Sequence, residues 1–192
     1  MIRLFTVLYK TNFSKVPSGI ELFNSVVALF KLTSAPCAKC GTHGSLEWHN
    51  GYKRYNVEYD GDVIEHIVWV KRVICKVCKR THAILPDILV PYNSYNIIFI
   101  LRVLKEYFHT RAVTAISNKY RISASTLYAW RDRYLVHATL DLGVIVEAAL
   151  ISSSHWLSNA FNICRTNATH DFYRRFGFSF LEYKKTARFS SA

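Results

Sequence analysis

Two cysteine pairs with the same C-x-x-C spacing, Cys37/Cys40 and Cys75/Cys78, constrain the fold of this chain more than any other feature. A two-residue gap lets both sulfurs of one tight turn face the same point, and two such turns complete a tetrahedron around zinc. Residues 41 to 74 connect the pairs and contain Asp60-Gly61, a dipeptide typical of hairpin turns. The sequence therefore predicts a β-hairpin zinc ribbon.

The expected cofactor is one structural Zn²⁺, because four protein thiolates leave no coordination position for water. Four thiolates around Zn²⁺ carry a net negative charge, and Lys39, Lys76, Lys79 and Arg80 lie in or beside the two turns to balance it. Gly41 after the first pair suits a tight knuckle, whereas Lys79 at the matching position departs from that pattern. The alternatives are a redox pair, four unligated cysteines, or replacement of one cysteine by a nearby histidine (His43, His49 or His82).

Hydrophobic periodicity divides the chain near residue 92 and predicts an α+β protein. Before that point we expect a strand over 2–9, a helix over 21–30, a hairpin over 48–74 and a strand over 82–85. After it every predicted element is a helix: one capped by Ser94 with an apolar stripe from Ile97 to Phe108, then 111–120, 123–140, 142–151, 155–165 and 169–176. The expected domains are 1–92 with the zinc ribbon, 93–140 with an all-α helix-turn-helix bundle, and 141–192 as a helical C-terminal extension.

Residues 112–130 have the pattern of a DNA-binding helix-turn-helix. Apolar residues fall at the positions that must be buried: Val113, Ile116, Ile122, Leu127 and Trp130. Ser123 is a good N-cap for the second helix, and Arg121 occupies a turn position that often requires a left-handed conformation. The expected DNA-binding residues are Arg121, Ser123, Ala124, Ser125, Thr126, Tyr128, Ala129, Arg131 and Arg133. A plain helical bundle would share the apolar positions and is the alternative.

Charge favours a polyanionic partner. The chain has 25 Lys and Arg against 13 Asp and Glu, a formal net charge of +12. Residues 93–140 alone hold seven basic and two acidic residues, so the excess falls on the predicted helix-turn-helix. No apolar run approaches the ~20 residues of a membrane span, and the first residues do not resemble a signal peptide. We therefore expect a cytoplasmic, nucleoid-associated protein that binds double-stranded DNA, with no membrane contact and no evident small-molecule substrate.

Several motifs resemble those of one family. They are Cys37-x-x-Cys40-Gly41, Trp48-His49-Asn50-Gly51-Tyr52-Lys53-Arg54, Arg72-Val73-Ile74-Cys75-x-x-Cys78-x-x-Thr81-His82-Ala83-Ile84-Leu85-Pro86, and Val90-Pro91-Tyr92. Together they resemble an uncharacterised prokaryotic family that joins a zinc ribbon to a helix-turn-helix and is linked to mobile elements. The same order of motifs is similar to the DNA-binding N-terminal part of insertion-sequence transposases and their accessory proteins. The resemblance covers residues 37 to about 134 and implies a role in transposition or transcription regulation.

The sequence shows no catalytic site, so we expect a protein that is not an enzyme. Residues 141–192 are too few for the α/β domain that holds a transposase's metal-binding carboxylates. Their many aromatic residues predict a core or a face for a homodimer or a separate transposase. The alternatives are a non-catalytic protein-interaction adaptor, the DNA-binding fragment of a larger transposase, and, as a weaker option, an RNA-binding protein.

Overall fold

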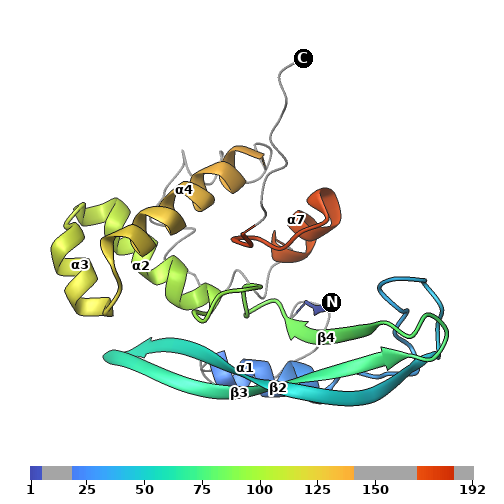
Figure 1. Ribbon diagram of the computed structural model, residues 1–192. Helices are drawn as coiled ribbons and strands as arrows, with labels where there is room; N and C mark the ends of the chain where they lie inside the picture. The colour runs from blue at the N-terminus through green and yellow to red at the C-terminus, as the bar shows by residue number, and fades with distance from the viewer. Residues whose placement is uncertain (6–18, 141–167, 184–192) are drawn as a thin grey trace.

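The computed structural model describes residues 1–5, 19–140 and 168–183, and these form an α+β structure (Figure 1). A four-stranded mixed sheet is followed by a helical region that lies on one side of it. The elements are β1 (Ile2–Leu4), α1 (Gly19–Ala28), β2 (Leu46–Asp60), β3 (Asp62–Cys75), β4 (Thr81–Pro86), α2 (Ile97–Thr110), α3 (Val113–Tyr120), α4 (Ala124–Leu140) and α7 (Ala168–Phe176).

The sheet has the strand order β1-β4-β3-β2. β1 pairs in parallel with β4, whereas β4 with β3 and β3 with β2 are antiparallel. β4 pairs with β3 only at Arg72–Ile74, so most of β3 has a single neighbour, β2. The predicted hairpin is confirmed, and it projects as a long two-stranded ribbon past the rest of the sheet (Figure 1).

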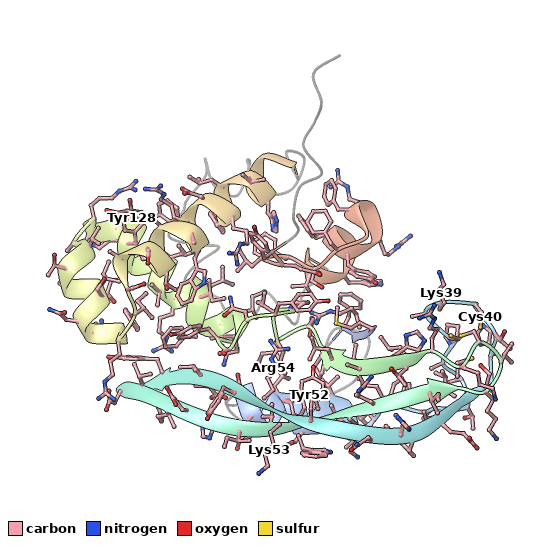
Figure 2. The ribbon with its side chains drawn as sticks, viewed as in Figure 1. Lys39, Cys40, Tyr52, Lys53, Arg54 and Tyr128 are labelled. Carbon is pink, nitrogen blue, oxygen red and sulfur yellow. The ribbon has the colours of Figure 1, made fainter. Side chains whose placement is uncertain are left out.

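The turn and one irregularity shape this hairpin. Gly61 has a φ of +77° between the paired residues Asp60 and Asp62, a left-handed conformation that favours glycine at a tight reversal of the chain. A bulge lies between Trp48 and Gly51, where the register with β3 shifts. The side chains then alternate along β2. Figure 2 shows Tyr52 and Arg54 on the side toward the helices and Lys53 pointing away from them.

Three expected helix starts differ from the structure, and one of them is the helix predicted over 111–120, which is α3 and begins at Val113. The helix predicted over 21–30 is α1, which begins two residues earlier, at Gly19. Ser94 does not cap α2; the cap is Asn96, whose side-chain oxygen accepts a hydrogen bond from the N–H of Phe99 at 2.7 Å. The carbonyl of Ser94 instead accepts from the N–H of Val57 in β2. The segment that contains Ser94 therefore pairs with β2 of the hairpin, and α2 begins only after this pairing ends.

The described core is one cluster that joins the sheet to the helices. It includes Val70 and Val73 from β3, Leu101 and Leu104 from α2, and Trp130 from α4. The rings of Tyr59 and Tyr120 lie 4.8 Å apart and connect the hairpin end to α3. The domain limits expected at residues 92 and 140 stay predictions. Among the described residues, no helix has the length and apolarity required to cross a membrane.

The predicted helix over 169–176 is confirmed as α7, and Gly177 follows it with a φ of +72°. Phe172 and Phe180 are buried, and their rings lie 5.2 and 5.8 Å from the ring of His137 in α4. These aromatic residues are therefore part of the core. The helices expected over 142–151 and 155–165 lie outside the described residues, as does most of the strand expected over 2–9.

Candidate metal centre and helix-turn-helix

The two cysteine pairs form turns with the same backbone hydrogen bonds. In the first, the N–H of Gly41 donates to the carbonyl of Cys37 at 2.9 Å, and the N–H of Cys37 donates to Thr42 at 3.0 Å. In the second, Lys79 donates to Cys75 at 2.9 Å, and Cys75 donates to Arg80 at 3.0 Å. The residue after the second cysteine of each pair is left-handed, with φ of +74° at Gly41 and +56° at Lys79. Lys79 thus completes the second turn, at a backbone cost of about 1 kcal/mol.

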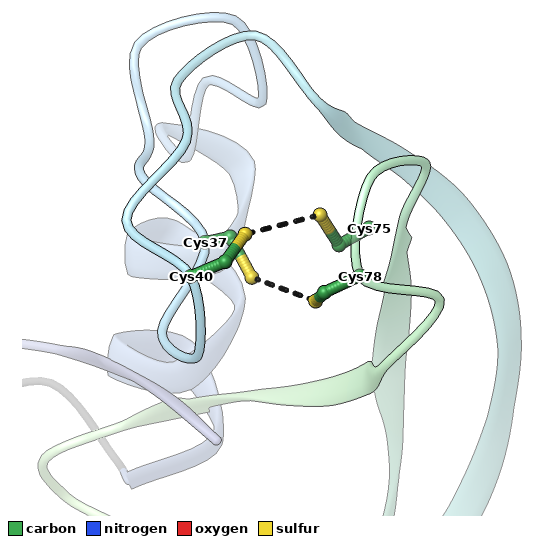
Figure 3. Close-up of side chains that lie close together, drawn as sticks. All are labelled: Cys37, Cys40, Cys75 and Cys78. Atoms are coloured by element: carbon green, nitrogen blue, oxygen red, sulfur yellow. Dashed lines mark hydrogen bonds between the residues drawn. The ribbon is translucent and has the colours of Figure 1, made fainter.

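The turns bring the four thiols together (Figure 3). The Sγ atoms of Cys37 and Cys78 are 3.6 Å apart, and those of Cys40 and Cys75 are 3.7 Å apart. All four sulfurs lie within 4.8 Å of one another. A zinc–sulfur distance of about 2.3 Å places tetrahedral sulfurs about 3.8 Å apart. The cluster therefore has the donors and the spacing to bind one metal ion, and thiolate donors favour zinc.

Neighbouring polar groups contact the sulfurs. The Ser45 hydroxyl lies 3.2 Å from the Sγ of Cys75, and the Thr42 hydroxyl lies 3.4 Å from the Sγ of Cys40. The Nε2 of His82 is 3.3 Å from the Sγ of Cys37. Outer contacts of this kind orient metal ligands and disperse their charge.

These contacts and the crowding of the thiols lower the pKa of Cys75 and raise the pKa of Cys78. The hydrogen bond with Ser45 lowers the pKa of Cys75 to about 6. The N–H of Arg80 lowers the pKa of Cys78, but burial and the three neighbouring thiols outweigh it and raise that pKa to about 11. Without a cation, the four sulfurs must share protons among them. A bound divalent cation would stabilise all four sulfurs in the deprotonated form, as expected of a metal-binding donor set.

None of the three histidines that could replace a cysteine belongs to the four-sulfur group. His43 and His49 are exposed, and His82 contacts Cys37 but is not one of the four clustered ligands. In the part of the chain that the structure describes, the four cysteines are the only such group of three or more potential ligands. The basic residues expected to balance the thiolates, Lys39, Lys76, Lys79 and Arg80, are all exposed, and Lys76 forms an ion pair with Glu47 at 2.5 Å.

α3 and α4 carry the local features that the sequence predicted for this pair of helices. Ile116, Ile122, Leu127 and Trp130 are buried, and Val113 is partly buried. Arg121 has the predicted left-handed conformation, with a φ of +50°. The Ser123 hydroxyl accepts a hydrogen bond from the N–H of Thr126 at 3.1 Å, so Ser123 caps α4 as predicted. The expected packing of the two helices is confirmed.

The expected DNA-binding side chains lie along the start of α4. Ser123, Ala124, Ser125, Tyr128 and Ala129 are exposed, and Thr126 is partly buried. Figure 2 shows Tyr128 on the outer side of the helices, at the opposite end of the molecule from Cys40. The start of α4 is therefore an open surface built from small residues.

The three expected arginines have different surroundings. Arg121 is exposed, and its guanidinium lies 2.9 Å from the Asp62 carboxylate at the hairpin turn. Arg131 pairs with Asp132 and lies over the Tyr128 ring at 4.7 Å. Arg133 is partly buried and donates to the carbonyl of Leu181 at 3.4 Å. Arg121 is thus the most accessible of the three, whereas Arg133 also holds the C-terminal segment.

Sequence reasoning missed the role of the hairpin surface. Trp48, Tyr55, Ile67 and Trp69 are among its exposed large side chains, although the pattern was interpreted only as evidence for strands. The signal was available, because Ile67 and Trp69 alternate with Val68 and Val70 along β3, and a ribbon that packs on one side cannot bury the apolar residues of both faces.

The comparisons with known proteins cover this same region. No curated protein and no solved structure is significantly similar to the chain. Residues 37–130 match a family described as a domain of unknown function, DUF6431. The match begins at the first cysteine and ends at Trp130 in α4, so it includes the thiol cluster, the hairpin, α2, α3 and the first part of α4. Residues 37–130 therefore match a DUF6431 domain, and this segment joins the four-cysteine cluster to the helical region of α2–α4.

Proposed function

We propose that this protein binds double-stranded DNA through its helix-turn-helix and needs one zinc ion to hold the fold that presents it. The observation that carries the proposal is the start of α4, which is capped by Ser123 and lined by exposed small residues. Small side chains let a helix approach the floor of the major groove closely. The N–H groups at that end of the helix also favour nearby phosphates.

The basic residues supply the affinity in this proposal. Arg102, Lys105, Arg111, Lys119 and Arg121 are exposed on or beside α2 and α3. Lys119 and Arg121 form ion pairs with Glu106 and Asp62, but exposed pairs of this kind are weak, about 0–1 kcal/mol, so a phosphate can replace either carboxylate. The start of α4 has no Arg, Asn or Gln, so the expected sequence specificity is modest.

The four thiolates and the hairpin form a zinc ribbon in this proposal, and the zinc is structural. Cys37, Cys40, Cys75 and Cys78 would hold it, and the ion would join the segment before β2 to the end of β3. The hairpin then acts as a rigid support whose turn contacts Arg121. No catalytic step is part of the proposal. Such a protein suits a transposition-associated factor or a transcriptional regulator.

One substitution tests the groove contact. Ala129→Glu places a carboxylate at an exposed position of α4 without changing the core, so it should repel DNA. Asn24→Glu is the matched control, because it adds the same charge at an exposed helical position of α1. We expect the first variant to lose at least about 10-fold in affinity for duplex DNA and the control to retain it. Equal affinities for the two variants would contradict the proposed mode of binding.

A further inference from the structure

The middle of the β2–β3 hairpin presents an unusual surface on one side. Lys53 pairs with Trp69 and Tyr55 pairs with Ile67 across the two strands, so these four side chains share a face. Gly51 pairs with Lys71 on the same face, and the Nζ of Lys71 lies 5.1 Å from the centre of the Trp48 ring. We call the set Trp48, Lys53, Tyr55, Ile67, Trp69 and Lys71 the hairpin face.

The hairpin face is open to solvent. The exposed fractions are 51% for Trp69, 52% for Tyr55 and 58% for Ile67. A solvent-facing side of an antiparallel ribbon normally carries polar residues, and clustered exposed apolar groups mark a binding surface. Figure 2 shows Lys53 pointing away from the helices, so the expected groove contact of α4 does not cover this face.

Gly51 explains the position of the Trp69 ring. A Cβ at residue 51 would lie 2.4 Å from the Nε1 and 2.7 Å from the Cε2 of Trp69. The indole therefore lies against the backbone of β2, in space that only glycine leaves free. One side of the ring rests on the strand, and the other side is available to a flat partner.

Charge indicates what that partner is. The six residues of the hairpin face include two ammonium groups and no carboxylate, and they belong to a chain with a net charge of +12. Lys53 is directly opposite Trp69, and Lys71 is beside Trp48, so cations alternate with aromatic rings. Alternating rings and cations suit a polymer with planar groups and regular phosphates. The bases of a duplex are stacked on each other, so the rings need unpaired bases.

We propose that the hairpin face binds single-stranded DNA. In this arrangement bases stack on Trp69 and Tyr55, and Lys53 and Lys71 contact the phosphates on either side. This site uses no residue of the helix-turn-helix and goes beyond the proposed function. A protein that bound duplex DNA with α4 and an unpaired strand with the hairpin would recognise a junction between the two, such as an opened DNA end.

The test measures binding of the full zinc-loaded chain to a labelled thymidine oligonucleotide. We expect Trp69→Ala to weaken binding by about 5- to 100-fold, the loss of one stacked base, and Trp69→Phe to restore part of it. Lys53→Ala should weaken binding less and reduce its salt dependence by about one phosphate contact. Tyr92→Ala is the control, because Tyr92 is 89% exposed but lies outside the hairpin face.

The two binding modes are separable. Trp69→Ala should retain affinity for duplex DNA, and Ala129→Glu should retain affinity for the thymidine oligonucleotide. A result that contradicts one proposal therefore does not contradict the other. Unchanged oligonucleotide affinity in both Trp69→Ala and Lys53→Ala would overturn the site, as would no binding by the wild-type chain. Tighter binding of a uridine ribo-oligonucleotide would overturn the assignment to DNA. Self-association that Trp69→Ala abolishes, without oligonucleotide binding, would show that a second copy occupies the face.

Discussion

The guanidinium of Arg121 lies 2.9 Å from the carboxylate of Asp62, and this ion pair joins the turn between α3 and α4 to the turn of the hairpin. The two residues are 59 positions apart in the sequence. Tyr59 and Tyr120 pack against each other beside them, with ring centres 4.8 Å apart. The hairpin therefore supports the helices at its far end, while the cysteine cluster closes its other end.

Replacing Arg121 with glycine should separate stability from DNA binding. Glycine removes the cost of the left-handed conformation, which offsets the lost exposed ion pair, so the free energy of unfolding should change by less than about 1 kcal/mol. Duplex affinity should fall, because a phosphate contact is lost. Denaturant unfolding and a DNA titration measure the two effects. Retained affinity in Arg121→Gly would show that Arg121 does not contact DNA.

Removing one cysteine of the cluster should release the metal. Cys75→Ser replaces a buried sulfur with a poorer zinc ligand. Only three thiolates then remain to bind the ion, so the four-sulfur coordination that stabilises this end of the hairpin is lost. We expect zinc content to fall from about one ion per chain to well below it, with a lower Tm. Cys164→Ser, which changes the one cysteine that belongs to neither C-x-x-C pair, is the control and should retain zinc. A fully zinc-loaded Cys75→Ser variant would refute the four-cysteine site.

The cap of α4 should contribute measurably to stability. The Ser123 hydroxyl accepts from the N–H of Thr126, so Ser123→Ala should cost about 1 kcal/mol of unfolding free energy. The Ser125 hydroxyl lies 2.8 Å from that of Ser123, but Ser125 is not the cap. Ser125→Ala should therefore cost less. If thermal unfolding shows equal losses for the two variants, Ser123 does not act as the cap.

His137 should make stability depend on pH. Burial, with a smaller contribution from Arg133, lowers the pKa of His137 to about 4, well below its usual value near 6.5. The neutral ring accepts a hydrogen bond from the N–H of Leu181 at 2.9 Å. The folded state therefore binds fewer protons than the unfolded state between these pKa values. The neutral His137 ring therefore contributes to the free energy of unfolding fully above about pH 6.5, and this contribution is lost progressively as the pH falls toward 4.

The variant His137→Gln isolates this effect, because acid also releases zinc from thiolates. The loss of unfolding free energy between pH 7 and pH 5 should be smaller in the variant than in the wild type. His109→Gln, at an exposed position of α2, should behave like the wild type. Identical pH profiles for His137→Gln and the wild type would mean that His137 titrates normally.

Local signals explain what the sequence predicted correctly. The hairpin was expected over 48–74 around Asp60-Gly61, and the strands span Leu46–Asp60 and Asp62–Cys75. The left-handed conformation of Arg121 and the Ser123 cap also follow from a pattern of neighbouring residues. The cysteine cluster was predictable because C-x-x-C spacing determines the geometry of each turn, and only the meeting of the two turns required the fold.

Contacts between distant segments explain what the sequence could not predict. Ser94 was the expected cap of α2, but the segment around it pairs with β2, which moves the start of the helix to Asn96. Arg133 donates to the carbonyl of Leu181, 48 residues later, a contact that no local pattern predicts, and its expected contact with phosphate stays a prediction. Neither the parallel pairing of β1 with β4 nor the ion pair between Asp62 and Arg121 leaves a local pattern.

Affinity for duplex DNA at two salt concentrations, measured on one zinc-loaded sample, tests the central claim most directly. The account predicts binding that weakens steeply as salt rises, with a logarithmic slope of about −0.9 for each phosphate contact, and Ala129→Glu should reduce it. A folded protein with one zinc ion per chain and no salt-dependent affinity for DNA would contradict the account. The cluster would then stabilise a protein-interaction adaptor rather than a DNA-binding protein.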